Sequence, residues 1–126
     1  MTQPYVVVDV ANVMGSVPDG WWRDRVGAAR RIRDSLETLA DRSVPGLPPP
    51  PLDVVLVVEG VARRIVDEDS PVPVVAAQGS GDDTIVELVA AAGDRPVLVV
   101  TADRGLRDRV TALGARVVGP RTLRPR

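Results

Sequence analysis

Residues 53–59 read Asp-Val-Val-Leu-Val-Val-Glu, and this stretch does most to decide the fold. Five consecutive apolar residues without polar alternation are typical of a parallel strand that is covered on both faces. Similar apolar runs predict further strands at 4–9, 72–77, 96–101 and 115–119. Because segments with helical spacing separate these runs, the sequence predicts right-handed βαβ units in one sheet.

The helical patterns are placed at about 22–42, 61–66, 82–92 and 106–113. Strands that alternate with helices predict an α/β fold, a Rossmann-like three-layer sandwich with a central parallel sheet. We expect the first strand to be central in that sheet.

The 126 residues suffice for one domain, which we assign to 1–126. One segment interrupts the alternation: residues 45–51 contain Pro45, Gly46 and four consecutive prolines at 48–51. Proline cannot continue a helix, so we interpret 45–51 as a stiff connector into the second strand. The chain closes with an Arg-rich C-terminal tail.

The composition excludes several kinds of chemistry. Cys and His are absent, which removes thiolate zinc sites, cysteine nucleophiles and histidine bases. All 16 basic residues are Arg, so a Walker A loop and Schiff-base chemistry are excluded as well. Metal binding would have to rely on oxygen ligands, which suit Mg²⁺ or Mn²⁺.

The charge is uneven along the chain. Up to Gly93 there are 8 Arg against 14 acidic residues, and from Asp94 on there are 8 Arg against 3. A basic segment beside an acidic pocket suits a polyanionic substrate, although a solvated surface would explain it equally well. No apolar run reaches the roughly 18 residues of a membrane span, and no signal peptide is recognisable, so a cytoplasmic location is expected.

Four carboxylates follow predicted strands. Asp9 ends the first apolar run, Asp82 and Asp83 open the helix after the third, and Asp103 follows the fourth. The carboxyl ends of parallel strands lie along one edge of the sheet, where ligands bind. Clustered carboxylates repel one another and persist where a divalent cation neutralises them. The sequence therefore predicts a metal site with these four residues as ligands.

Each of these residues also has a structural interpretation. Asp9 and Asn12, which we expect in the loop after the first strand, could simply cap a turn. Asp82 is a plausible helix N-cap, and Asp83 would sit in the first turn, where the helix dipole favours negative charge. Two adjacent acids after two glycines exceed what a cap requires. Asn12 could instead orient a water or a phosphate.

Other residues are candidates for supporting or RNA-binding positions. The supporting candidates, beside the proposed ligands, are Glu59, Glu87, Thr101 and Asp108. Arg104 and Arg107 are near enough to Asp103 to meet a phosphate. Trp21 and Trp22 could stack on unpaired bases, although burial of one of them as a helix anchor is the plainer interpretation.

Three segments together resemble a known family. They are VVVDVANVMGS at 6–16, GSGDDTIVELV at 79–89 and VLVVTADRGLRDRVTALGARVVG at 97–119. This order resembles the NYN domain family of PIN-like nucleases, which implies a Rossmann-like fold and metal-dependent ribonuclease activity. The resemblance covers nearly the whole chain except the connector and the tail.

By position, the resemblance implies that Asp9, Asn12, the pair Asp82 and Asp83, and Asp103 form the catalytic site. Asp108 matches a further acid of some relatives only loosely. Val10 stands where the family often has Gly.

The sequence therefore favours a metal-dependent endoribonuclease that acts on single-stranded or structured RNA with Mg²⁺ or Mn²⁺. No membrane partner is expected, and a homodimer is left open. The alternative is a PIN-like module that binds RNA or protein with little or no activity. A phosphatase with an Asp nucleophile is disfavoured, because such enzymes usually have a second Asp two residues on, where this chain has Ala11.

Overall fold

The computed structural model describes residues 3–123, so the end of the Arg-rich tail lies outside the described residues. Its strands are β1 (Tyr5–Asp9), β2 (Asp53–Val58), β3 (Val74–Ala76), β4 (Val97–Val100) and β5 (Arg116–Val118). Its α-helices are α1 (Val10–Gly15), α2 (Arg25–Ser35), α3 (Gly81–Ala91) and α4 (Arg104–Thr111). Short 3-10 helices are η1 (Trp21–Arg23), η2 (Leu39–Asp41), η3 (Gly60–Asp67) and η4 (Pro120–Leu123).

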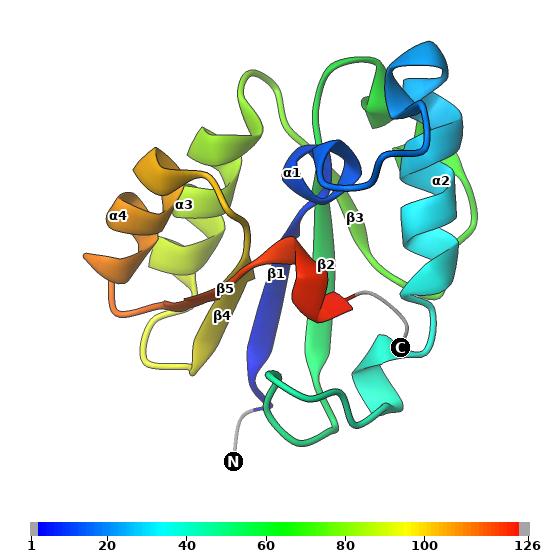
Figure 1. Cartoon of the computed structure of the whole chain (residues 1–126). Coiled ribbons are helices and arrows are strands. Elements are labelled where there is room, and N and C mark those ends of the chain that lie inside the picture. Colours follow the sequence, from blue (N-terminus) through cyan, green and yellow to red (C-terminus); the bar gives the residue numbers. More distant parts are fainter. Residues whose placement is uncertain (1–2, 124–126) are drawn as a thin grey trace.

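The five strands form one parallel sheet in the order β3-β2-β1-β4-β5, so the prediction of a central first strand is confirmed. Val8 of β1 lies opposite Leu56 of β2 and Val100 of β4. This register places the residues that follow these strands at one edge of the sheet. In Figure 1 that edge is at the top, where β1 ends and α1 begins.

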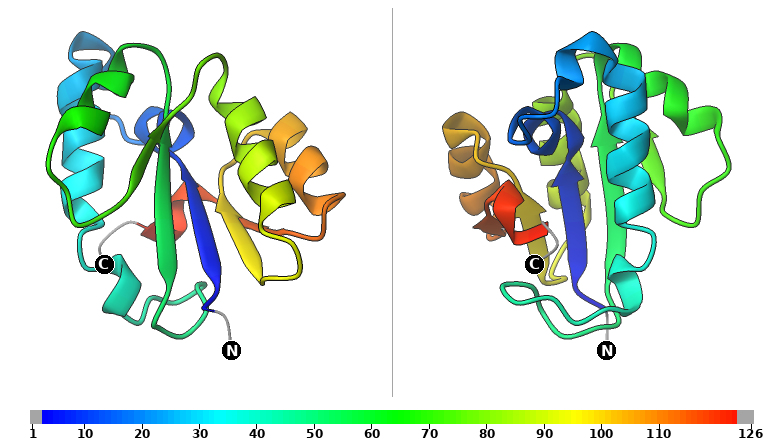
Figure 2. Two further views of the ribbon diagram at one scale, coloured as in Figure 1. Left: turned by 180° about the vertical axis from the view of Figure 1, so that it is seen from behind. Right: turned by 45° about the vertical axis from the view of Figure 1, so that its right-hand side comes forward.

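Two apolar cores lie on opposite faces of the sheet. Val6 and Val8 of β1 belong to the core shared with α1 and α2, whereas Val7 belongs to the core shared with α3 and α4. All three valines are fully buried, as expected for a strand without polar alternation. The views in Figures 1 and 2 show the helices on both sides of the sheet. The predicted three-layer α/β fold is therefore confirmed.

The predicted helix over 22–42 is divided into η1, α2 and η2. Leu36 and Leu39 are both fully buried, and their spacing of three suits tight turns as well as a helix. The segment predicted at 61–66 is a 3-10 helix, η3. Residues 45–51 run without helix or strand into β2.

One helix was not predicted. α1 begins directly after β1, with Asp9 as its N-cap, and buries Val10, Val13 and Met14. The expectation that Asn12 lies in a loop is therefore wrong, because Asn12 is within α1. Two β-branched valines in a segment of six residues gave a weak helical signal. None of the helices within residues 3–123 is long and apolar enough to cross a membrane.

Candidate acidic site at the sheet edge

Asp9 is the buried centre of the site. It ends β1 and is only 5% exposed. Its Oδ2 accepts a hydrogen bond from Thr101 Oγ1 at 2.9 Å, and its Oδ1 accepts one from the Asn12 backbone N–H at 3.3 Å. Burial raises the pKa of Asp9 to about 6; the two hydrogen bonds oppose this rise, and the charges of Asp82 and Glu59 add to it. Asp9 therefore lies close to two further carboxylates.

Asn12 and Thr101 connect helix α1, which follows β1, with the segment that follows β4. The Asn12 Oδ1 accepts a hydrogen bond from the Ala102 backbone N–H at 2.7 Å. Thr101, which is fully buried, also accepts a hydrogen bond from the Asp103 backbone N–H at 3.1 Å. These contacts link Asp9 to the start of α4. In this arrangement Asn12 positions the backbone beside the site.

Glu59 is more central than the sequence suggested. It follows β2, and its Oε2 accepts a hydrogen bond from the Gly81 backbone N–H at 2.6 Å. This contact places a carboxylate at the N-terminus of α3, where the helix dipole stabilises negative charge. A Cβ atom at Gly81 would lie 3.4 Å from the Glu59 carboxylate, in ordinary van der Waals contact.

Asp82 faces the cluster without serving as a helix cap. The N-cap of α3 is Ser80, whose Oγ accepts a hydrogen bond from the Asp83 N–H, so the prediction of Asp82 as the N-cap is wrong. Burial raises the pKa of Asp82, and the charges of Asp103 and Glu59 raise it further. Asp82 directly follows Gly81, whose N–H binds Glu59, so the Asp82 and Glu59 carboxylates lie in one region.

Asp103 completes the cluster from the end of β4. It is the N-cap of α4, and its Oδ1 accepts a hydrogen bond from the Leu106 N–H at 2.8 Å. The structure therefore gathers four carboxylates, from four segments that are far apart in the sequence. We call Asp9, Glu59, Asp82 and Asp103 the acidic cluster.

Asp83 and the outer candidates lie at the surface. Asp83 is exposed and forms an ion pair with Arg109 at 3.0 Å. The side chains of Glu87, Asp108, Arg104 and Arg107 are exposed too. Sequence reasoning missed Arg109, whose charge opposes the rise in the pKa of Asp82. Arg109 lies only two residues after Arg107, in the same Arg-rich segment, and this was an available signal.

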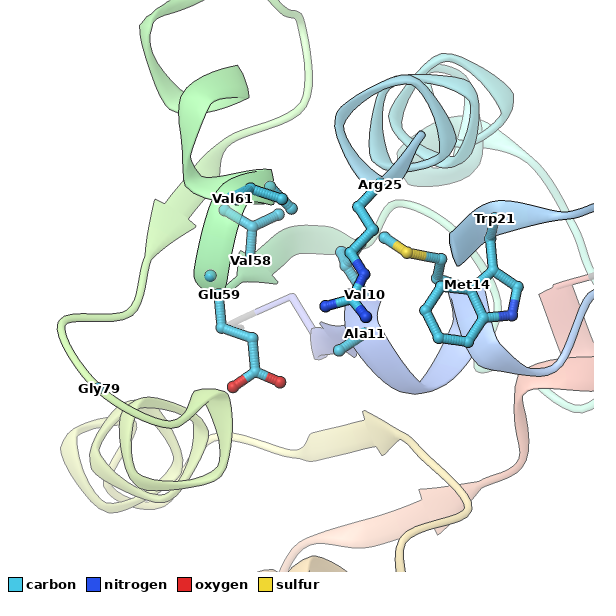
Figure 3. A pocket seen from close by; sticks show the side chains of 11 residues that line it. Val10, Ala11, Met14, Trp21, Arg25, Val58, Glu59, Val61 and Gly79 are labelled. Atoms are coloured by element: carbon cyan, nitrogen blue, oxygen red, sulfur yellow. The ribbon is translucent and has the colours of Figure 1, made fainter. Parts of the chain in front are cut away.

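A pocket of about 470 Å³ lies beside the acidic cluster and shares Glu59 with it. Trp21 and Arg25 line it, and the Arg25 guanidinium lies 5.5 Å from the centre of the Trp21 ring. Trp22 is 56% exposed and is not among the lining residues. Figure 3 shows the Arg25 side chain between those of Glu59 and Trp21. Sequence reasoning missed Arg25, although its spacing of four from Trp21 suits such a contact.

The acidic cluster supplies the oxygen donors that Mg²⁺ and Mn²⁺ prefer. Among residues 3–123, however, no three acidic side chains are arranged so that they could hold a metal ion in their present positions. Asp9, Glu59 and Asp103 are engaged in hydrogen bonds within the chain. A carboxylate oxygen has two lone pairs, so each of these oxygens keeps the capacity to accept a further ligand.

The chain is similar to known proteins in its fold. No family model matches the sequence, and no curated protein matches it. Two crystal structures of Rae1 (YacP) from Bacillus subtilis are similar in fold. One has a TM-score of 0.77 at 16% identity, covering 98% of this chain and 71% of Rae1. The other, a mutant, has a TM-score of 0.72 at 18% identity, covering 96% and 72%. At this identity, the likeness establishes a shared fold.

Proposed function

We propose that this chain is a metal-dependent endoribonuclease whose active site is the acidic cluster. The observation that carries the proposal is the buried carboxylate of Asp9, whose pKa is raised to about 6 beside two further acids. Clustering of this kind opposes folding unless positive charge compensates it. Perturbed carboxylates at the carboxyl edge of a parallel sheet are typical of functional sites.

A divalent cation is the compensating charge that we propose for this site. Asp9, Asp82 and Asp103 would hold Mg²⁺ or Mn²⁺, with Glu59 as a further oxygen donor. A bound cation of this kind neutralises charge that develops on a phosphodiester and makes a water more acidic. The chain has no His and no Lys, so its own alternatives for activating water are few.

The surrounding residues would prepare the site. Thr101 holds one oxygen of Asp9 and thereby fixes the direction of the carboxylate. Asn12 fixes the loop at Ala102, next to Asp103. The exposed side chains of Arg104 and Arg107 follow the site on α4, where they could bind the flanking phosphates.

RNA as the substrate is proposed from the likeness of the sequence motifs. The motifs around Asp9, Asp82 and Asp103 resemble NYN domains in order and residue type, and the likeness to Rae1 agrees with the fold that this resemblance implies. The Arg surplus after Asp94 adds positive charge to the segment that forms α4 and the strands beside it.

The test is direct. Purified protein is incubated with 5′-labelled single-stranded and hairpin RNA in Mn²⁺, in Mg²⁺ or in EDTA. We expect internal cuts with a divalent cation and intact RNA in EDTA. Intact RNA under all conditions would refute the proposal.

A binding module without activity is the second candidate. It is favoured by the hydrogen bonds of Glu59 and Asp103, because each of these carboxylates already caps a helix and so has a structural role. Such a module would bind RNA or a partner protein with the same affinity in Mg²⁺ and in EDTA and would not cut RNA.

A further inference from the structure

The pocket beside the acidic cluster has the size and lining of a ligand site. Its volume of about 470 Å³ lies within the range of roughly 300–1,000 Å³ that is usual for small-molecule sites. The walls combine apolar side chains, such as Val58 and Met14, with the indole of Trp21. Two charged groups, those of Arg25 and Glu59, complete the lining.

Arg25 is a cation without an anionic partner. Among the described residues its guanidinium forms no hydrogen bond and no ion pair, and its central carbon lies 5.5 Å from the centre of the Trp21 ring. Other arginines of helix α2 are paired, as Arg30 and Arg33 are with Glu68. A planar cation close to an indole in a largely apolar pocket offers surfaces on which a flat aromatic ring can stack.

We infer that this pocket holds one unpaired base of the bound RNA, next to the phosphodiester that faces the acidic cluster. The base would stack on the Arg25 and Trp21 planes against the aliphatic wall that includes Val61, which is 51% exposed. This inference rests on the proposed function, because the strand reaches the pocket only if its backbone crosses the acidic cluster. Ala11 and Glu59 line the pocket, and Ala11 lies two residues after Asp9, so base and phosphate sites adjoin.

The chemistry favours a base over other occupants. A phosphate would be repelled by Glu59, which lies on the pocket wall. A purely aliphatic group would leave the Arg25 guanidinium desolvated without a partner. A nucleobase avoids both problems, since it offers a π face to the Arg25 cation and carries no negative charge that Glu59 would repel. A duplex cannot present such a base, so the substrate would be single-stranded at this position.

A matched pair of tryptophans allows a sharp test. Trp21 and Arg25 line the pocket. Trp22 and Arg23 do not line it, although the Arg23 guanidinium lies at a similar distance, 5.8 Å, from the centre of the Trp22 ring. The chain has only two Trp residues, so Trp22→Phe leaves Trp21 as the only indole and Trp21→Phe leaves Trp22. Each variant is titrated in EDTA, where cleavage is not expected, with a short oligoadenylate. The control ligand is an abasic ribose-phosphate strand of equal length.

We expect oligoadenylate to quench Trp21 fluorescence and to leave Trp22 fluorescence largely unchanged. The abasic strand should quench neither. Arg25→Met and Trp21→Leu should each weaken oligoadenylate binding by about tenfold, as expected for the loss of one base stack, whereas Arg23→Met should have little effect. The Arg25 variant keeps the apolar stem, so it tests the site even if Trp21→Leu unfolds.

The outcomes separate this inference from the proposed function. Equal binding by the Arg25 and Arg23 variants, with RNA cleavage intact in Mn²⁺, would overturn the base pocket and leave the ribonuclease standing. Failure of every variant and of the wild type to bind or cut RNA would overturn both.

Discussion

Asp9→Asn should make the protein more stable at neutral pH in the absence of metal. The pKa of Asp9 is about 6 in the folded state, against 3.8 for an unperturbed Asp. The folded state therefore holds this proton more tightly than the unfolded chain does. The stability that this contributes is complete below about pH 4 and is lost as the pH rises through about 6.

The size of the effect follows from the shift. A pKa of Asp9 that is higher by about two in the folded state corresponds to on the order of 3 kcal/mol of stability lost between pH 4 and pH 8. Asparagine cannot ionise and avoids this loss, while it still serves as an N-cap for α1. Its NH₂ group cannot accept the hydrogen bond from Thr101, which costs about 1 kcal/mol. The variant should therefore be about 2 kcal/mol more stable at pH 8 and slightly less stable at pH 4.

The assay is urea unfolding followed by circular dichroism in EDTA, at intervals between pH 4 and pH 8. Only the difference between wild type and variant is informative, because Glu68, with its pKa lowered to about 2 by Arg30 and Arg33, adds a pH dependence of the opposite sign. Asp108→Asn on the exposed side of α4 controls for the loss of one negative charge. A difference between wild type and Asp9→Asn that stays constant with pH would refute the reasoning.

Three further outcomes are expected. In thermal unfolding, Mn²⁺ should raise the Tm of the wild type more than it raises the Tm of Asp103→Asn. An equal rise in the two proteins would exclude Asp103 as a ligand. Glu59→Gln, which keeps an acceptor for the Gly81 N–H, should reduce RNA cleavage by at least about tenfold with little change in Tm, and full activity would place Glu59 outside the site. Arg33→Met removes a nearly buried cation that contacts Glu68 and should cost about 1–3 kcal/mol in urea unfolding with the cleavage rate unchanged; a loss of activity without a loss of stability would contradict this structural role.

The sheet was predictable because its signal is local. The run at Val54–Val58 and its counterparts are short, rich in valine and apolar without alternation, which is typical of strands covered on both faces. The position of β1 at the centre was expected from the order of the runs and from the acidic residues that follow the first, third and fourth of them. Convergence of Asp9, Asp82 and Asp103 then followed from the parallel arrangement.

The details that were missed depend on contacts between distant segments. Ser80 and Asp82 are both good N-cap residues, and the sequence offered no way to choose between them. In the structure Glu59, 22 residues before Gly81, binds the Gly81 N–H and thereby fixes where α3 begins. The pocket could not be predicted either, because its walls come from segments that are far apart in the sequence, including those that carry Met14, Trp21 and Val58.

The most direct test of the acidic site compares RNA cleavage and RNA binding in Asp9→Asn. The cleavage rate in saturating Mn²⁺ should fall at least about 100-fold, a barrier increase of about 2.7 kcal/mol, because a ligand of the cation is lost. RNA binding, measured in EDTA, should be equal or tighter, because a negative charge near the phosphates is removed. Cleavage by Asp9→Asn at the wild-type rate, or cleavage by either protein in EDTA, would contradict a metal-dependent ribonuclease centred on Asp9.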